Sequence, residues 1–276
     1  MCSVESPIRN GDDVNVICAA MEAPSRYASV LRPGLFAGQL HWVTGGGSGI
    51  GRCVAHELAS LGAQVVLVGR KAEKLQAVQD EITQDGGHAS FQVCDIRQED
   101  AVKQAVTAIV TQHGRIDGLV NNASDFFATA FGSVTSEQWD RLFASNARAP
   151  FFLAQAAAPQ LKKTGGAIVN LLDIYAERPL AGHSVYCMAK AAQAAMTHAL
   201  ALELGPEVRV NGVAPGAVMW PEADSDAAHR AKIIERTPLK RTGQPAEIAD
   251  AVLWLLRDAR FVTGQIIRVD GGRFFA

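Results

Sequence analysis

The sequence predicts one α/β domain, built on a doubly wound parallel sheet with helices on both faces. Three observations lead to this fold class. Seven short apolar runs alternate with helix-like stretches, no internal repeat or interdomain linker separates them, and 48% of the 276 residues are hydrophobic. A chain of this length and composition can fill one substantial core, so we expect a single domain.

The seven apolar runs have the length and continuous hydrophobicity of parallel strands that are buried on both faces. They span residues 40–45, 63–69, 90–95, 117–123, 166–173, 208–216 and 264–272. Helix-like stretches occupy residues 50–61, 71–85, 99–113, 136–163, 184–204 and 245–257. This alternation is typical of successive βαβ units, which form parallel sheets.

Residues 1–36 mix acids, prolines and small residues without periodicity. We interpret them as a loosely ordered N-terminal extension and expect the domain to span residues 37–276. The segment has no basic start followed by an apolar stretch, as a secretory signal would have. Asp12, Asp13 and Glu22 argue against a mitochondrial presequence.

Charge and cysteine content exclude several classes of function. Acids and bases are interspersed and the net charge is −2, whereas nucleic-acid binding requires clustered Lys and Arg. No apolar run is long enough to cross a bilayer. The five cysteines are scattered, odd in number and without metal-ligand spacing. We therefore expect reduced thiols, no metal site and a cytoplasmic location.

A glycine-rich turn follows the first predicted strand and opens the first predicted helix. Glycines there let the backbone approach a pyrophosphate, and the helix N-terminus offers free N–H groups and positive potential. Loops also use glycine for purely steric reasons, but this position favours dinucleotide binding. The residues expected to hold the cofactor are Gly45, Ser48, Gly49, Ile50 and Gly51.

The second predicted strand ends in Gly69, where an NAD enzyme usually carries an acid for the ribose 2′-hydroxyl. Arg70 and Lys71 follow. A guanidinium can bind a 2′-phosphate through two hydrogen bonds, so NADP(H) is the expected cofactor. The alternative is that both cations are solvated residues at a helix start.

Tyr186 and Lys190 are four residues apart, so one helix face presents both. An ammonium beside a phenol favours phenolate and lowers its pKa, which makes proton exchange with a substrate feasible. The alternative is an ordinary surface pair of helix neighbours.

Asp173 lies thirteen residues before Tyr186, at the expected carboxyl end of a strand, where open α/β sheets bind ligands. An ionised carboxylate would repel a carbonyl oxygen that gains charge as hydride arrives, so simple ketone reduction is disfavoured. A carboxyl group suits the N–H edge of a heterocycle better. With a pKa raised by burial, it can also protonate a C=N nitrogen.

The spacing G-x-x-x-G-x-G, the segment NNAS (121–124) and Y-x-x-x-K together resemble the short-chain dehydrogenase/reductase family from about residue 37 to the end. The resemblance implies a Rossmann-like fold and a homotetramer. It also implies that Lys190 holds the nicotinamide ribose and that Asn146 carries a water-linked proton relay, although a buried asparagine can simply satisfy helix backbone groups. Further cofactor contacts are implied for Asp95, Asn121, Asn122, Ala123, Pro215 and Gly216.

The pattern Asp-x12-Tyr-x3-Lys is similar to the pteridine reductases of that family. This resemblance implies that Ser124 borders both cofactor and substrate, that Phe126 stacks on a pterin, and that Trp220 lies in a segment covering the substrate. Core packing is the alternative for both aromatic residues. Gly49 departs from the arginine usual in that branch. Residues up to about 122 resemble instead reductases of enoyl thioesters and dehydrogenases of terpenoid alcohols, which suggests a mosaic chain.

The leading hypothesis is NADPH-dependent reduction of a pterin or dihydrofolate-like substrate, with protons from Asp173, Tyr186 and Lys190. One alternative is an NADP(H)-dependent oxidoreductase of a carbonyl or enoyl thioester. A second is a non-catalytic NADP-binding regulator, which would have no need of Tyr186, Lys190 and Asn146 together.

Overall fold

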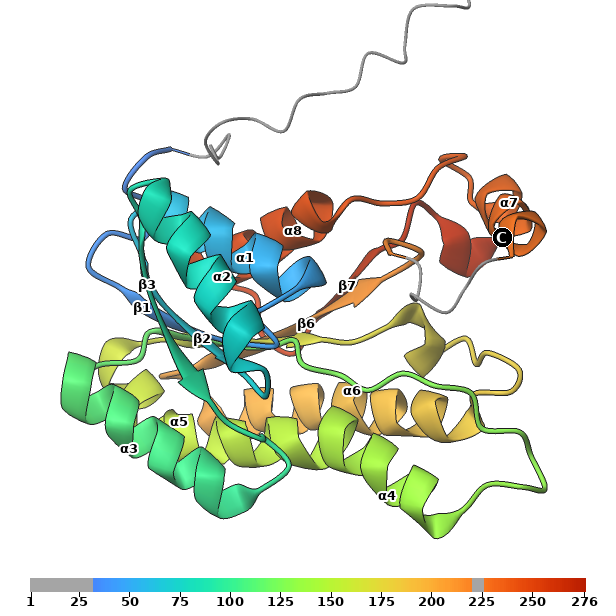
Figure 1. Cartoon of the computed structure of the whole chain (residues 1–276), viewed down its shortest axis with the longest axis horizontal. Helices are drawn as coiled ribbons and strands as arrows, with labels where there is room; N and C mark the ends of the chain where they lie inside the picture. Colours follow the sequence, from blue (N-terminus) through green and yellow to red (C-terminus); the bar gives the residue numbers. More distant parts are fainter. Residues whose placement is uncertain (1–31, 220–225) are drawn as a thin grey trace, which may run out of the picture.

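The computed structural model describes residues 32–219 and 226–276, which form one parallel sheet covered by helices on both faces (Figure 1). Its seven strands have the order β3-β2-β1-β4-β5-β6-β7, and each neighbouring pair is parallel. The strands are β1 (Leu40–Thr44), β2 (Gln64–Gly69), β3 (His88–Val93), β4 (Gly118–Asn121), β5 (Ala167–Leu171), β6 (Arg209–Pro215) and β7 (Ile266–Val269).

The helices are α1 (Gly49–Ser60), α2 (Ala72–Gln84), α3 (Glu99–His113), α4 (Ser136–Phe143), α5 (Ala149–Thr164), α6 (Ser184–Leu204), α7 (Ala227–Arg236) and α8 (Pro245–Arg257). Three short helical turns complete the fold: η1 (Ala144–Arg148), η2 (Ile174–Ala176) and η3 (Arg273–Phe275). The predicted fold class is confirmed, and all seven predicted strands are present, with β3 beginning two residues earlier than expected.

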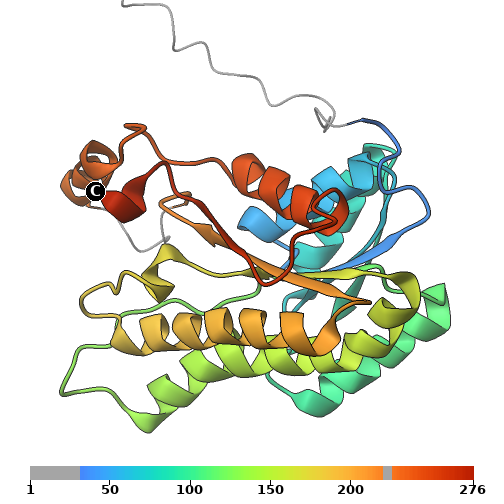
Figure 2. The ribbon, with the colours of Figure 1, turned by 180° about the vertical axis from the view of Figure 1, so that it is seen from behind.

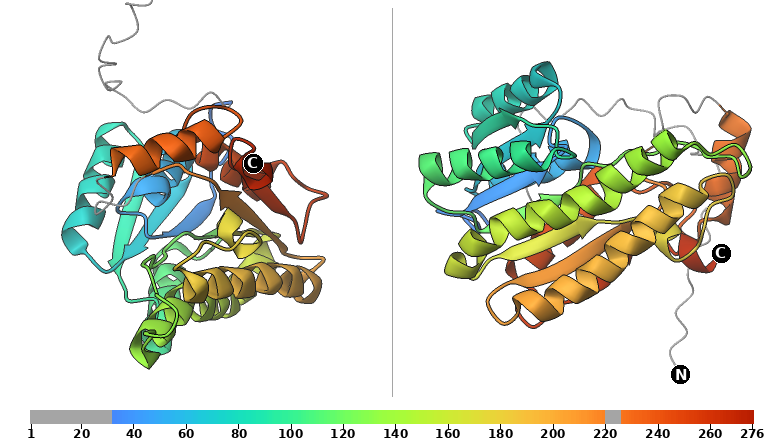
Figure 3. Two further views of the ribbon diagram at one scale, coloured as in Figure 1. Left: turned by 90° about the vertical axis from the view of Figure 1, so that its right-hand side faces the viewer. Right: turned by 90° about the horizontal axis from the view of Figure 1, so that it is seen from below.

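Two layers of helices enclose the sheet. Helices α1, α2 and α8 cover one face, and α3, α5 and α6 lie side by side on the other (Figures 1, 2 and 3). Side chains of a strand alternate between these layers. In β1, Val43 joins the core under α1 and α8, whereas Trp42 joins the core under α3 and α5. Burial on both faces accounts for the largely apolar sequences of inner strands such as β2 and β6, whereas the edge strands β3 and β7 are less buried.

The order of strands reverses between β1 and β4, which are neighbours in the sheet although β2 and β3 intervene in the chain. The loops that follow these two strands therefore diverge to opposite sides. The crevice left between them is the usual ligand site of an open parallel sheet. It contains the glycine-rich turn after β1 and the 122–127 loop after β4.

The helical stretch predicted at 136–163 is divided, because the five residues of η1 form a π-helical turn between α4 and α5. The backbone N–H of Ala149 donates to the carbonyl of Ala144, five residues back. Pro150 follows immediately at the start of α5 and has no N–H to donate. Single π-turns of this kind occur frequently at functional sites.

The packed domain begins earlier than residue 37. Phe36 is fully buried and its backbone N–H donates to the carbonyl of Leu61, so it belongs to the core and not to an extension. Residues 1–31 and Trp220 lie outside the described residues. Among the described helices none has the length and apolarity to span a membrane, and the described residues contain no cluster of three or more side chains that could bind a metal.

Candidate active site

The glycine-rich turn has the geometry of a phosphate cradle. Gly45 and Gly49 adopt positive φ angles of 66° and 55°, which side chains rarely allow. A Cβ on Gly51 would lie 2.4 Å from Asn122 Nδ2 and 2.5 Å from the Gly45 carbonyl oxygen. Helix α1 begins here with Ser48 as N-cap, without a side-chain cap or an acid in its first turn. Its N–H groups therefore remain available to an anion.

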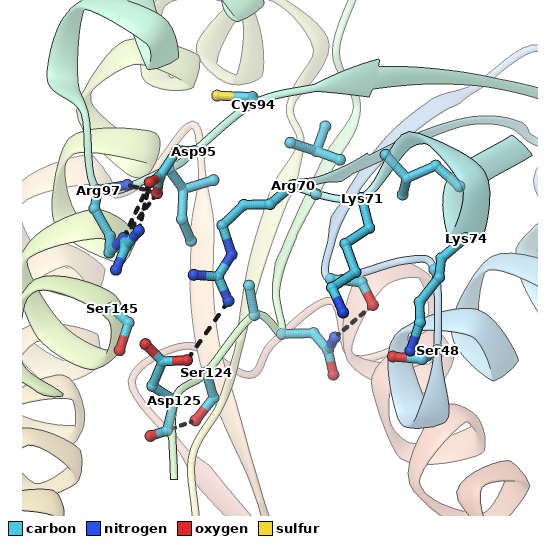
Figure 4. Close-up of a pocket in the computed structure, with 18 residues that line it drawn as sticks. Ser48, Arg70, Lys71, Lys74, Cys94, Asp95, Arg97, Ser124, Asp125 and Ser145 are labelled. Carbon is cyan, nitrogen blue, oxygen red and sulfur yellow. Dashed lines mark hydrogen bonds and ion pairs between the residues drawn. The ribbon is translucent and has the colours of Figure 1, made fainter. Parts of the chain in front are cut away.

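A pocket of about 340 Å³ opens beside this turn (Figure 4). Its lining includes eight of the residues predicted to bind the cofactor: Gly45, Ser48, Arg70, Lys71, Asp95, Asn122, Ala123 and Ser124. Gly49, Ile50 and Gly51 belong to the adjoining helix start, while Pro215 ends β6 and Gly216 follows it. The glycine cradle and the free N–H groups fit the diphosphate of a dinucleotide, and the pocket fits its adenosine end.

Four cations line or border this pocket: Arg70, Lys71, Lys74 and Arg97. Arg97 is bound to Asp95 through Nε and Nη2, at 2.9 and 2.6 Å, and this pairing lowers the pKa of the carboxyl. Lys74 was missed by sequence reasoning. Its signal was the spacing of three from Lys71, which brings the two side chains to the same side of the first turn of α2.

Asn122 ties the turn to the loop after β4. Its side chain donates to the carbonyl oxygen of Thr44 at 2.9 Å, and its backbone N–H donates to Thr44 Oγ1 at 3.0 Å. The expectation that Asn121 lines the cofactor cleft is wrong. Its side chain is buried and donates to Asn170 Oδ1 at 2.9 Å, between β4 and β5. Asn122, the next residue, lies beyond the end of β4 in the loop that borders the crevice.

Tyr186 and Asp173 form the chemical end of the site. The Tyr186 hydroxyl donates to Asp173 Oδ2 at 2.8 Å, and the backbone N–H of Tyr175 donates to Oδ1 at 3.0 Å. Asp173 follows β5 and caps η2, so the strand delivers it to the carboxyl edge of the sheet. Tyr186 is buried in the first turn of α6.

Burial raises the pKa of Asp173, although the hydrogen bonds from Tyr175 and Tyr186 and the charges of Lys190 and Arg273 oppose the effect. Burial also raises the pKa of Tyr186 well above its ordinary value, and Asp173 adds to that rise. Each group therefore keeps its proton to a higher pH than it would in water. This corrects the expectation that a neighbouring ammonium lowers the pKa of the phenol.

The position of Lys190 explains why its ammonium does not lower the pKa of Tyr186. Its Nζ donates to the Leu171 carbonyl oxygen at 2.7 Å and to Gln193 Oε1 at 3.1 Å, and it stands 6.0 Å from the centre of the Tyr186 ring. The side chain is buried, which lowers the pKa of Lys190 to about 8. The Asp173 carboxyl contacts the phenol directly, whereas the ammonium is directed to neutral acceptors.

Asn146 lies fully buried in the π-turn η1. Its amide donates to the carbonyl oxygens of Asp125 and Leu142 at 2.9 and 3.0 Å, and its Oδ1 accepts from Ser124 Oγ at 2.6 Å. Ser124 also lines the cofactor pocket. Asn146 thus links the pocket to α4, and its predicted relay with Lys190 stays a prediction.

Phe126 is half exposed, so core packing does not account for it. One face of its ring stacks on His183, with centroids 4.8 Å apart, and its ring meets Tyr186 edge to face at 4.8 Å. His183 therefore occupies one of the two faces of the Phe126 ring on which a pterin could stack.

The presence of glycine rather than arginine at position 49 has a steric explanation. A Cβ at this position would lie 3.2 Å from Met219 Sδ, and the backbone is left-handed there. An arginine, as found in the pteridine reductase branch, would require both strain and displacement of Met219. Glycine therefore suits this position better than the arginine of that branch.

The chain is similar to known oxidoreductases over most of its length. Residues 45–273 match the sequence model of a family described as Enoyl-(Acyl carrier protein) reductase. L-xylulose reductase of Caenorhabditis elegans is 38% identical over 241 residues, which cover 83% of this chain and 93% of that protein.

Two solved structures extend the similarity. A citronellol catabolism dehydrogenase from Pseudomonas aeruginosa PAO1 is 44% identical, with a TM-score of 0.81 and coverage of 90% of this chain and 100% of that chain. A short-chain type dehydrogenase/reductase from Mycobacterium ulcerans is 34% identical, with a TM-score of 0.83 and coverage of 87% and 91%. Each alignment passes through residue 122, so these relatives give the mosaic interpretation no support. None of them is named a pteridine reductase.

Proposed function

The chain belongs to the short-chain dehydrogenase/reductase family, and from this premise we propose that it is an NADP(H)-dependent oxidoreductase of a small carbonyl or hydroxyl compound. The observation that carries the proposal is the Tyr186–Asp173 hydrogen bond of 2.8 Å at the carboxyl edge of the sheet that also holds the glycine cradle. The names of the relatives, an L-xylulose reductase and a citronellol catabolism dehydrogenase, agree with this substrate class.

When bound in the glycine cradle, NADPH would supply the hydride that the carbonyl carbon accepts. The residues of the chain supply the proton and hold the substrate. As the C=O π bond breaks, the oxygen takes the proton of the Tyr186 hydroxyl, and Asp173, in hydrogen-bond contact with that hydroxyl, is placed to return a proton to it. Oxidation of an alcohol reverses these transfers.

The objection to ketone reduction assumed an ionised carboxylate at Asp173. Burial raises the pKa of that carboxyl, and its protonated form donates a hydrogen bond to a carbonyl oxygen as a serine hydroxyl does. The carboxyl is therefore compatible with an oxygen acceptor.

We propose NADP(H) because β2 ends in Gly69 without an acid, while Arg70, Lys71 and Lys74 line the adjoining pocket. The site roles proposed from the family are ribose binding for Lys190, a proton relay for Asn146, and nicotinamide contacts for Pro215 and Gly216. A homotetramer and a cytoplasmic location remain proposals of the same kind.

A pterin or dihydrofolate-like substrate is the second candidate. One observation favours it: a carboxyl group with a raised pKa, bonded to the tyrosine, can protonate the nitrogen of a C=N bond. The stacking of His183 on Phe126 weighs against it, and so does the left-handed backbone of Gly49, which disfavours the arginine usual in that branch.

The test is NADPH oxidation with sugars, terpenoid aldehydes, cyclic ketones, an enoyl thioester and dihydropterins as substrates, for the wild type and Asp173→Ser. We expect turnover of a carbonyl compound, and Asp173→Ser should retain it within about ten-fold because serine also donates to oxygen. Turnover confined to dihydropterins and abolished by Asp173→Ser would establish the second candidate instead. Binding of NADPH without any turnover would support a non-catalytic regulator.

A further inference from the structure

Two arginines from different elements converge on Asp125, a carboxylate at the edge of the cofactor pocket that no sequence motif singled out. Arg141 of α4 approaches Asp125 Oδ2 with Nε at 3.1 Å, and Arg70, which follows β2, approaches Oδ1 with Nη2 at 3.7 Å. The Asp125 side chain is only 11% exposed, whereas the two guanidinium side chains are about half exposed.

Arg70 crosses the pocket to make this contact (Figure 4). It lies between two carboxylates, since its charge also lowers the pKa of Asp95 on the other wall. Asp95 is already bound through both oxygens by Arg97. The contact between Arg70 and Asp125 is single and longer than a hydrogen bond, so Arg70 is the guanidinium in this pocket most easily transferred to another anion.

We propose that Asp125 is a cofactor-selectivity residue, because its carboxylate competes with the ribose 2′-phosphate for Arg70. The inference rests on the NADP(H) preference proposed above. A 2′-phosphate is an anion of higher charge that accepts two parallel hydrogen bonds from a guanidinium. The ribose of NADH carries only a hydroxyl there, so NADH binding gains nothing from releasing Arg70. Asp125 therefore weakens NADPH binding selectively.

Loss of the Arg141 charge should change NADPH affinity in the direction opposite to loss of Asp125. Arg141 shares the carboxylate with Arg70, and its guanidinium also lies over the Phe127 ring, 5.0 Å from the ring centre. When Arg141 loses its charge, Asp125 has one cation left and holds Arg70 more strongly. Removing Asp125 and removing the Arg141 charge break the same ion pair but should move NADPH affinity in opposite directions.

The experiment is fluorescence titration of NADPH and NADH at low ionic strength, with Asp125→Asn, Arg141→Met, Arg70→Met and the double variant Asp125→Asn/Arg70→Met. Since half-exposed ion pairs contribute little, we expect Asp125→Asn to lower the Kd for NADPH by about three-fold to five-fold. We expect Arg141→Met to raise it by about two-fold, and neither variant to change the Kd for NADH by more than about 1.5-fold. In the Arg70→Met background, Asp125→Asn should have no effect.

Three results would overturn the proposal. Asp125→Asn and Arg141→Met could shift NADPH affinity in the same direction, as loss of a purely structural ion pair would. The two cofactors could respond equally. The effect of Asp125→Asn could persist without Arg70, which would make it a general charge effect. If Arg70→Met itself leaves the ratio of NADPH to NADH affinity unchanged, the proposed NADP(H) preference fails and not merely the role of Asp125. Thermal melting identifies variants that fail to fold.

Discussion

The hydroxyl of Tyr186 donates a hydrogen bond to Asp173 Oδ2 across 2.8 Å, although thirteen residues separate them in the chain. Strand β5 delivers the carboxyl and helix α6 delivers the phenol to the same edge of the sheet. Burial raises the pKa of both groups, so each keeps its proton to a higher pH than the same group would in water.

Tyr186→Phe should lower kcat for carbonyl reduction by about 10²-fold to 10⁴-fold, the usual contribution of a positioned proton donor. The change removes one oxygen and keeps the ring that packs against Phe126. The Kd for NADPH should therefore change by less than about two-fold. Steady-state kinetics and cofactor titration test this. Activity within ten-fold of the wild type would remove Tyr186 from the chemistry.

Asp173→Asn should stabilise the folded protein at about pH 8. The folded-state pKa of Asp173 is raised. At a pH above that pKa the wild type holds a buried negative charge, which lowers the free energy of unfolding. This destabilisation disappears as the pH falls and the carboxyl gains its proton. We expect the variant to melt about 2–4 °C higher at pH 8, with a smaller gain at pH 5.5. A gain that grows at lower pH would contradict the sign.

Gly51→Ala should weaken NADPH binding by about ten-fold or more. The added methyl group would lie 2.4 Å from Asn122 Nδ2 and 2.5 Å from the Gly45 carbonyl oxygen, so it displaces the cradle on which the diphosphate is expected to sit. Gly69→Ala is the matched control in the same pocket, since its Cβ would meet only Leu75, at an ordinary 3.4 Å. Equal losses in both variants would show that the clash is not the cause.

His41 should make the protein less stable as the pH falls. Burial lowers its pKa from 6.5 to about 4, with partial compensation by Asp117. Between these values the unfolded chain binds a proton that the folded chain does not, so stability is lost as the pH falls through this window, by about 3 kcal/mol in full. His41→Phe keeps the edge-to-face contact with Phe36 and should reduce the slope in urea unfolding measured between pH 6.5 and 5. An unchanged slope would assign the effect to other groups, such as His56.

Most strands were predictable because they are largely apolar runs, and α6 and α8 were predicted with their observed bounds. Tyr186 and Lys190 were predictable because their relationship is local, one helical turn. The direction of the Lys190 ammonium was not, since its acceptors are a carbonyl of β5 and Gln193, and only the packed structure selects them.

Contacts between segments far apart in the chain could not be predicted from the sequence either. Arg70 and Asp125 are separated by 55 positions and meet only because β2 and β4 flank β1 in the sheet. Asn121 and Asn122 look equivalent in the sequence, but β4 ends between them, so Asn121 stays buried in the sheet and Asn122 lies in the loop at the crevice. The pteridine reductase branch was inferred chiefly from the position of Asp173. That inference assumed an ionised carboxylate, because the burial of the side chain cannot be seen in the sequence.

The widened turn at Ala144–Arg148 fixes how Asn146 faces Ser124. Such a turn contains one residue more than regular helical winding, and each residue advances a helix by about 100°. Deleting one residue between positions 144 and 148 would remove the extra residue and turn α4 by about 100° relative to α5, which would move the Asn146 amide away from Ser124. The contact between Asn146 and Ser124 thus depends on the number of residues in this short segment as much as on their identity.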